Sequence, residues 1–265
     1  MRQPCLGECL TICFVWVWDG ADFIYPRRGA SILNAKNEST DPKPATPALL
    51  FEFDHLVAGV REATFDILSR MFEGTDFSAM HISRFGLNVP PQKMIENIQQ
   101  ALGQKKSPAK KLADELISGI QMHLETEVIQ VSDALRDVIV QARERHMPVY
   151  ALTALPEHAR EALGDRLDLP GLGIEYVPFG VGLEPYPRAD AWLKVSKDHD
   201  IIGPQSIALT TSHAALKSVL TAGIHCVAIP DRFTEFQDFG GAQAVVESPG
   251  EVVLADLIVK PFQAA

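Results

Sequence analysis

Five short apolar runs, separated by amphipathic helical patterns, constrain the fold of this chain more than any other feature. Continuous apolar strands that alternate with helices are typical of a parallel sheet covered on both faces. We therefore predict an α/β fold, with a Rossmann-like parallel sheet and helices on both of its faces. The runs lie at Leu49–Phe53, Val149–Leu152, Ile174–Pro178, Ser206–Leu209 and Cys226–Ile229.

The segments between the runs have helical periodicity and recognisable ends. Pro187 is suited to a first helical position, Ser212 to an N-cap, and Gly223 to the position after a C-cap. These signals predict where two of the helices begin and where one ends. The helical patterns lie at Ala58–Phe72, Ser132–His146, Pro156–Leu163, Pro187–His199 and Ser212–Ala222.

One long segment interrupts the alternation of runs and helices. It has helical patterns at Phe77–Phe85, Pro90–Leu102 and Ser107–Thr126, with no apolar run between them. We predict that residues 76–127 are an inserted all-helical unit. Residues 48–75 and 128–265 then form the α/β core, a division that suits a chain of 265 residues.

Residues 1–47 differ from the rest of the chain and are predicted to be a poorly ordered extension. Asp41–Pro44 is a linker signal. The apolar stretch Cys9–Trp18 is too short to cross a bilayer, and Arg2 is the sole positive side chain before it. We predict a cytoplasmic protein without a membrane span. A secretory signal within residues 1–30 is the alternative.

The charge of the chain limits the classes of partner. A net charge of −10 and an isoelectric point near 5.3 exclude a broad electrostatic surface for nucleic acid. An acidic balance of this size is common in soluble proteins. We therefore predict an unknown small molecule or a protein as the partner, and no nucleic acid.

The first apolar run ends on acidic residues. Glu52-Phe53-Asp54-His55 follows the strand at the position where one group of α/β enzymes carries D-x-D-G. On these residues the chain resembles the haloacid dehalogenase-like hydrolases, which are mostly phosphatases and phosphomutases. In that resemblance Asp54 matches the second aspartate. Glu52 stands where the family has its nucleophilic aspartate, and His55 where it has glycine.

Three further segments extend the resemblance over most of the chain. Thr153, at the end of the second run, matches a family Ser or Thr that binds the transferred phosphoryl group. The segment Glu184–Trp192 resembles K-P-x-P-x-x-x-[YW], and Thr210–Ser212 resembles [GE]-D-S. The resemblance implies that the helical unit 76–127 is a cap over the active site. It also implies Mg²⁺ held by the residues at positions 52 and 54 and by an acidic residue of the last motif.

Several of these positions depart from the family pattern. The side chain of Glu52 is one methylene longer than aspartate, and a misplacement of about 1 Å can cost about 100-fold in rate. Glu184 replaces a lysine, and Thr210 and Thr211 replace acidic groups. Together these changes predict a catalytically degenerate protein, a pseudo-phosphatase with a binding, regulatory or scaffolding role.

Two alternatives stay open at this point. One is an active phosphatase or phosphomutase that acts on a small phosphorylated metabolite through Asp54. The other is a structural subunit of an assembly, whose extension docks on a partner. Generic phosphatase assays and mass measurements with and without residues 1–47 separate the three readings.

The predicted site follows from these matches. We expect no cofactor, or Mg²⁺ or another divalent cation if the site holds one, with Glu52 and Asp54 as its ligands. If Glu52, Asp54 and Glu184 converge, one carboxyl pKa rises or a cation or amine binds, because like charges so close cannot all ionise. The predicted catalytic positions are Glu52 and Asp54, and the predicted ligand-binding residues are His55, Thr153, Glu184, Thr211 and Ser212.

Overall fold

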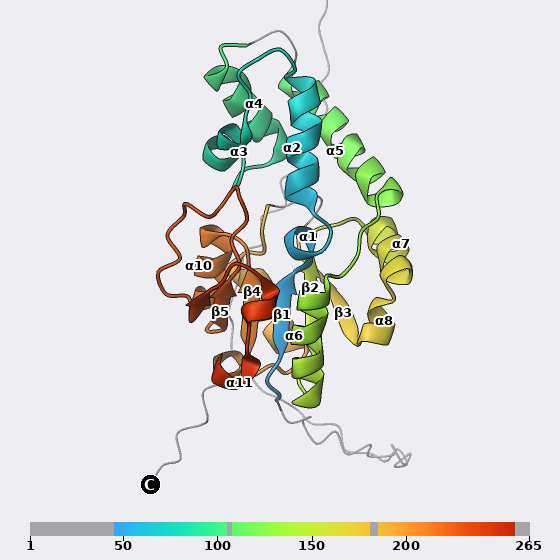
Figure 1. Cartoon of the computed structure of the whole chain (residues 1–265), viewed down its shortest axis with the longest axis vertical. Coiled ribbons are helices and arrows are strands. Elements are labelled where there is room, and N and C mark those ends of the chain that lie inside the picture. Colours follow the sequence, from blue (N-terminus) through green and yellow to red (C-terminus); the bar gives the residue numbers. More distant parts are fainter. Residues whose placement is uncertain (1–44, 105–107, 181–184, 258–265) are drawn as a thin grey trace, which may run out of the picture. The chain divides into compact units, whose positions relative to one another are not determined.

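The computed structural model describes residues 45–104, 108–180 and 185–257. Within them, six parallel strands form one sheet in the order β3-β2-β1-β4-β5-β6 (Figure 1). The predicted α/β class with a Rossmann-like parallel sheet is confirmed. The strands are β1 (Leu49–Glu52), β2 (Val149–Thr153), β3 (Ile174–Pro178), β4 (Ile207–Thr210), β5 (His225–Ala228) and β6 (Ala244–Val245).

The helices of the described residues match the predicted helical patterns and add several short elements. They are α1 (Phe53–Leu56), α2 (Val60–Met71), α3 (Ala79–Phe85), α4 (Pro91–Ala101), α5 (Ala109–Thr126), α6 (Asp133–Glu144), α7 (Glu157–Leu167), α8 (Leu169–Leu172), α9 (Ala189–Asp198), α10 (His213–Thr221) and α11 (Leu254–Leu257). The 3-10 turns Gly203–Gln205 and Pro249–Glu251 complete the list.

Helices cover both faces of the sheet because the strands are apolar on both sides. All four residues of β1 are buried, and its three apolar residues alternate between two apolar clusters. Leu49 and Phe51 pack into the cluster that includes α6 and α7, whereas Leu50 packs with Trp192 of α9. Burying a side chain such as Leu50 stabilises the fold by about 1.5–3 kcal/mol.

The parallel register places the functional positions at one edge of the sheet. Glu52 pairs with Leu152 of β2, and Phe51 pairs with Leu209 of β4. Parallel strands all end at the same edge, which is where ligands bind in open α/β sheets. The residues that end or follow β1, β2 and β4 are therefore neighbours, although they lie far apart in the sequence.

Helices α2, α3, α4 and α5 lie together beyond this edge of the sheet (Figure 1). Between α2 and α6 the described residues form no strand. Helices α2 and α5 approach closely at Gly119, where an added Cβ would lie 3.0 Å from Ile67. The division into core and helical unit stays a prediction. The structure adds that α2, which that division assigns to the core, packs on α5.

The ends of the helices agree with the sequence signals in part. The Ser212 hydroxyl accepts a hydrogen bond from the Ala215 amide, as expected of an N-cap, and Gly223 has the left-handed φ of +74°. Pro187 is not the first helical residue, because α9 begins at Ala189 with Arg188 as its N-cap. The missed strand β6 has two residues, too few for an apolar run.

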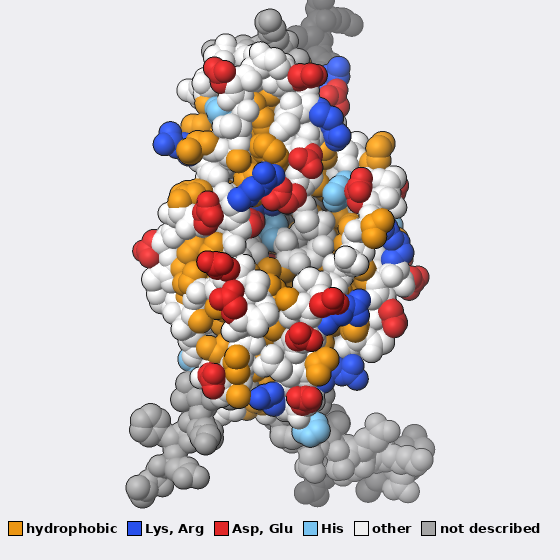
Figure 2. All heavy atoms as spheres, in the orientation of Figure 1, with side chains coloured by type: hydrophobic (Ala, Val, Ile, Leu, Met, Phe, Trp, Pro, Cys, Tyr) orange, Lys and Arg blue, Asp and Glu red, His pale blue; other side chains and the backbone are white. Residues whose placement is uncertain are grey.

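Of the predicted extension, residues 1–47, only residues 45–47 are described; residues 1–44, and with them the secretory alternative, lie outside the described residues. In the part of the chain that the structure does describe, no helix combines the length and apolar character needed to cross a membrane. Acidic and basic side chains are interspersed over the face drawn in Figure 2.

Candidate functional site

Glu52, the last residue of β1, is buried and is held by the residue that follows β4. One of its carboxyl oxygens accepts hydrogen bonds from the Thr211 amide at 2.6 Å and the Thr211 hydroxyl at 3.1 Å. The other oxygen is buried and has no hydrogen-bond partner among the described residues. Burial raises the pKa of Glu52 to about 7, although Thr211 and the positive charge of Arg61 act in the opposite direction.

Asp54, on the short helix α1, is held by the end of β2. Its two carboxyl oxygens accept hydrogen bonds from the Thr153 hydroxyl and, at 2.9 Å, from the Ala154 amide. Burial raises the pKa of Asp54 to about 6 against the effect of these two hydrogen bonds. Both oxygens of the Asp54 carboxyl group are therefore engaged by the protein itself.

His55 is neutral and has a defined tautomer. Its Nε2 lies 3.1 Å from the carbonyl oxygen of Pro185. A carbonyl can only accept, so Nε2 carries the proton and Nδ1 keeps its lone pair. Burial, and then the positive charge of Arg61, lower the pKa of His55 to about 3. The Nδ1 atom is buried and lacks a partner in the described part of the chain.

Two site residues, Arg61 and Asp231, were not among the predicted ones. The buried Arg61 of α2 forms an ion pair with Asp231, which follows β5, and donates from Nη2 to the Thr211 hydroxyl at 3.2 Å. Asp231 also accepts from the Phe233 amide at 2.9 Å and the Thr234 hydroxyl at 3.0 Å. The position of Asp231 just beyond the fifth apolar run was a signal that could have placed it here.

The remaining predicted residues fall into three groups. Thr153 and Thr211 lie with Asp54 and Glu52, as described above. The Ser212 hydroxyl is engaged in capping α10. Glu184 lies outside the described residues, so the hypothesis of three converging carboxylates stays a prediction.

The described residues, as they lie, do not fit a divalent cation. Mg²⁺ requires several oxygen ligands in near-octahedral geometry. Asp54 has both oxygens engaged, and the Thr211 hydroxyl is shared between Glu52 and the guanidinium of Arg61. No cluster of three His, Cys, Asp or Glu suited to a metal occurs in residues 45–104, 108–180 and 185–257. The positive charge of Arg61 lies beside Thr211, the position at which the resemblance implies an acidic metal ligand.

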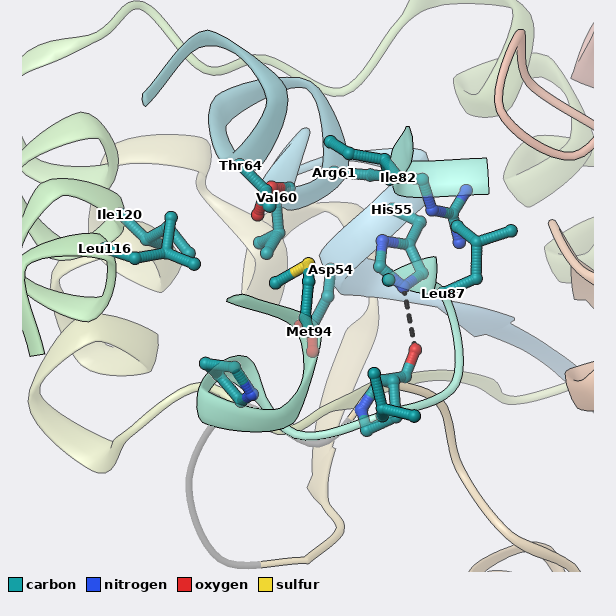
Figure 3. A pocket seen from close by; sticks show the side chains of 14 residues that line it. Asp54, His55, Val60, Arg61, Thr64, Ile82, Leu87, Met94, Leu116 and Ile120 are labelled. Atoms are coloured by element: carbon teal, nitrogen blue, oxygen red, sulfur yellow. Dashed lines mark hydrogen bonds between the residues drawn. The ribbon is translucent and has the colours of Figure 1, made fainter. Parts of the chain in front are cut away.

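A cavity of about 70 Å³ lies between this site and the helices beyond it (Figure 3). Asp54, His55, Arg61 and Thr64 supply its polar lining. The apolar lining comes mainly from α2 to α5 and the loop after α3, and includes Val60, Ile82, Leu87, Met94, Leu116 and Ile120.

Comparison with known proteins identifies the fold. No family model matches the sequence, and no curated protein matches it significantly. A family IA, variant 3 HAD hydrolase from Entamoeba histolytica superposes with a TM-score of 0.62 at 18% identity, over 81% of this chain and 100% of that one. The chain has the haloacid dehalogenase-like fold.

Further solved structures with this haloacid dehalogenase-like fold agree. CbbY from Rhodobacter sphaeroides in complex with phosphate has a TM-score of 0.58 at 17% identity, over 77% of this chain and 95% of that chain. A haloacid dehalogenase-like family hydrolase from Streptococcus pneumoniae has a TM-score of 0.59 at 16% identity, over 81% and 98%. At these identities the likeness establishes the fold alone, and the activity has to be argued from the site.

Proposed function

We propose that this protein is a catalytically degenerate member of the haloacid dehalogenase-like group, a pseudo-phosphatase that binds a small molecule without turning it over. One observation carries the proposal. The guanidinium of Arg61 donates to Thr211 and pairs with Asp231. Thr211 is the position at which the resemblance requires a metal-binding carboxylate. The positive charge of Arg61 is thus balanced by a carboxylate of the protein itself, that of Asp231.

The chemistry of phosphoryl transfer explains why this arrangement opposes turnover. The reaction depends on positioned positive charges that neutralise the developing negative charge on the phosphoryl oxygens. Arg61 has its charge balanced by Asp231, and the described residues contain no cluster of three His, Cys, Asp or Glu suited to a metal. With a pKa of about 7, Glu52 is largely protonated below neutral pH, and a protonated carboxyl group is a poor nucleophile.

The helices beyond the sheet edge supply the other half of the proposed binding site. Ile82 of α3, Met94 of α4 and Leu116 of α5 line the same cavity as Asp54 and His55. We include in the proposal that these helices act as a cap, which covers a bound molecule and keeps it from water. The role of the protein is then binding or regulation.

A phosphatase assay tests the proposal. We expect the full-length protein to hydrolyse p-nitrophenyl phosphate with Mg²⁺ no faster than its Asp54→Asn variant does. An Asp66→Asn variant, altered at an exposed position of α2, is the matched control. Turnover that Asp66→Asn retains and Asp54→Asn loses would establish the alternative, an active hydrolase that uses Asp54.

A further inference from the structure

The cavity beside Asp54 contains one hydrogen-bonding atom that the protein leaves unused. Figure 3 shows His55 at the cavity, with one ring nitrogen joined to the Pro185 carbonyl and the other facing the side where Val60 and Met94 lie. This second nitrogen, Nδ1, is buried without a partner in the described residues. A buried acceptor left unsatisfied destabilises the folded protein, so a ligand that donates a hydrogen bond to it binds more tightly than one that cannot.

The other polar side chains of the cavity each already form at least one hydrogen bond within the protein. Asp54 accepts from Thr153 and Ala154, and Arg61 donates to Asp231 and Thr211. The hydroxyl of Thr64 donates to the carbonyl of Val60 at 2.7 Å. Among the described residues that line the cavity, His55 Nδ1 is the buried side-chain atom that still lacks a partner.

The surroundings of Nδ1 disfavour a charged ligand. The lining is mostly hydrocarbon, and moving an ion from water into such surroundings is unfavourable unless a counter-ion meets it. A cation would face the positive charge of Arg61, which acts after burial in lowering the pKa of His55, and would find both oxygens of the Asp54 carboxyl group already accepting hydrogen bonds. A phosphate would find that charge balanced by Asp231, and would bring its negative oxygens against the lone pair of Nδ1.

We propose that this cavity binds a small uncharged molecule that is mostly hydrocarbon and carries one O–H or N–H group, which donates to His55 Nδ1. The proposal rests on the proposed function and names the class of ligand for it. The volume of about 70 Å³ limits the enclosed part of the ligand to a few heavy atoms, since a cavity of about 150 Å³ is needed to take up benzene. A larger molecule would place its apolar end here.

A pair of isomers separates the hydrogen bond from simple apolar burial. The full-length protein, labelled at the methionine and isoleucine methyl groups, is titrated with 1-butanol and with diethyl ether, which lacks the donor. We expect saturable shifts of the Met94, Ile82 and Ile120 methyl signals, with 1-butanol bound about tenfold more tightly, which corresponds to about 1.4 kcal/mol. Inorganic phosphate and butylammonium should leave these signals unchanged.

Two variants locate the effect. His55→Phe keeps a ring but removes the acceptor, so the preference for the alcohol should disappear, whereas the control His158→Phe, at an exposed position of α7, should keep it. Equal affinities for alcohol and ether, absence of saturable alcohol binding, or tighter binding of phosphate or butylammonium to the unaltered protein would each overturn the proposal. If His55→Phe does not fold, the affinities of the unaltered protein for the four ligands test the proposal by themselves. Phosphatase turnover is measured separately, so failure of the ligand class and failure of the proposed function are distinguishable.

Discussion

Arg61 and Asp231 are 170 residues apart in the sequence and form an ion pair at the carboxyl end of the sheet. Arg61 has only 7% of its side chain exposed, whereas Asp231 has 31% exposed. Through its second nitrogen, Arg61 reaches Thr211, whose hydroxyl in turn donates to Glu52. The pair therefore connects α2, the loop after β5 and the ends of β1 and β4.

The first prediction concerns the stability that this pair contributes. Arg61→Met leaves the Asp231 carboxylate without its cation, and we expect a loss of about 3 kcal/mol in the free energy of unfolding. The control is Arg232→Met, because Arg232 pairs with Glu62 where both side chains are about half exposed, and exposed pairs contribute about 1 kcal/mol or less. Urea denaturation measures both losses. Equal losses in the two variants would show that the burial of Arg61 does not increase the contribution of its ion pair to the free energy of unfolding.

The second prediction concerns cations. We expect titration calorimetry of the unaltered protein with millimolar Mg²⁺ to give no saturable heat, because Arg61 stands beside Thr211 and Asp231. In Arg61→Met the Asp231 carboxylate and the unpartnered oxygen of Glu52 become available, and weak Mg²⁺ binding should appear. Arg232→Met should behave like the unaltered protein. Tight Mg²⁺ binding by the unaltered protein would contradict this account of the site.

The third prediction concerns pH. The pKa of Glu52 is raised from its ordinary value of 4.5 to about 7, so the folded state binds more protons than the unfolded state between these values. The stabilisation is complete below pH 4.5 and is lost as the pH rises through 7, by about 1.4 kcal/mol per unit and about 3 kcal/mol in total. Asp54 contributes with the same sign, but only up to its pKa of about 6.

The difference in stability between the unaltered protein and Glu52→Gln, measured at pH 6 and at pH 7, isolates Glu52, because Asp54 and His55 contribute to both proteins. His55, whose pKa is lowered to about 3, acts with the opposite sign in this interval. The stability of the unaltered protein relative to Glu52→Gln, which cannot ionise, should fall from pH 6 to pH 7. Glu161→Gln, at an exposed position of α7, serves as the control and should behave like the unaltered protein. A difference that rises with pH over this interval would refute the assignment.

The fourth prediction tests how Asp54 is held. Thr153→Val removes the hydroxyl that donates to Asp54 while it keeps the size and branching of the side chain. We expect a loss of about 1–3 kcal/mol, because a buried carboxyl oxygen is left unsatisfied. Thr221→Val at the exposed end of α10 removes a hydroxyl that bonds the carbonyl of Lys217, and it should cost less. Unfolding by urea at constant pH compares the two variants.

Much of the fold could be predicted because its signals are local. The runs that became β1 to β5 and the patterns that became α2 to α7, α9 and α10 each depend on residues a few positions apart. The resemblance at the ends of three of these runs then grouped Glu52, Thr153 and Thr211 in one predicted site. The short elements α1, α8, α11 and β6 escaped prediction because they contain too few residues to show a period.

The sequence by itself therefore determined the class of fold and the edge of the sheet where the site lies. The tertiary structure alone decided what that site is. It brought Arg61 to Thr211 and Asp231, turned both oxygens of Asp54 toward the end of β2, and left Nδ1 of His55 without a partner in the described residues. These outcomes depend on which side chains meet across long separations and on how deeply they are buried, and no local pattern of residues encodes either.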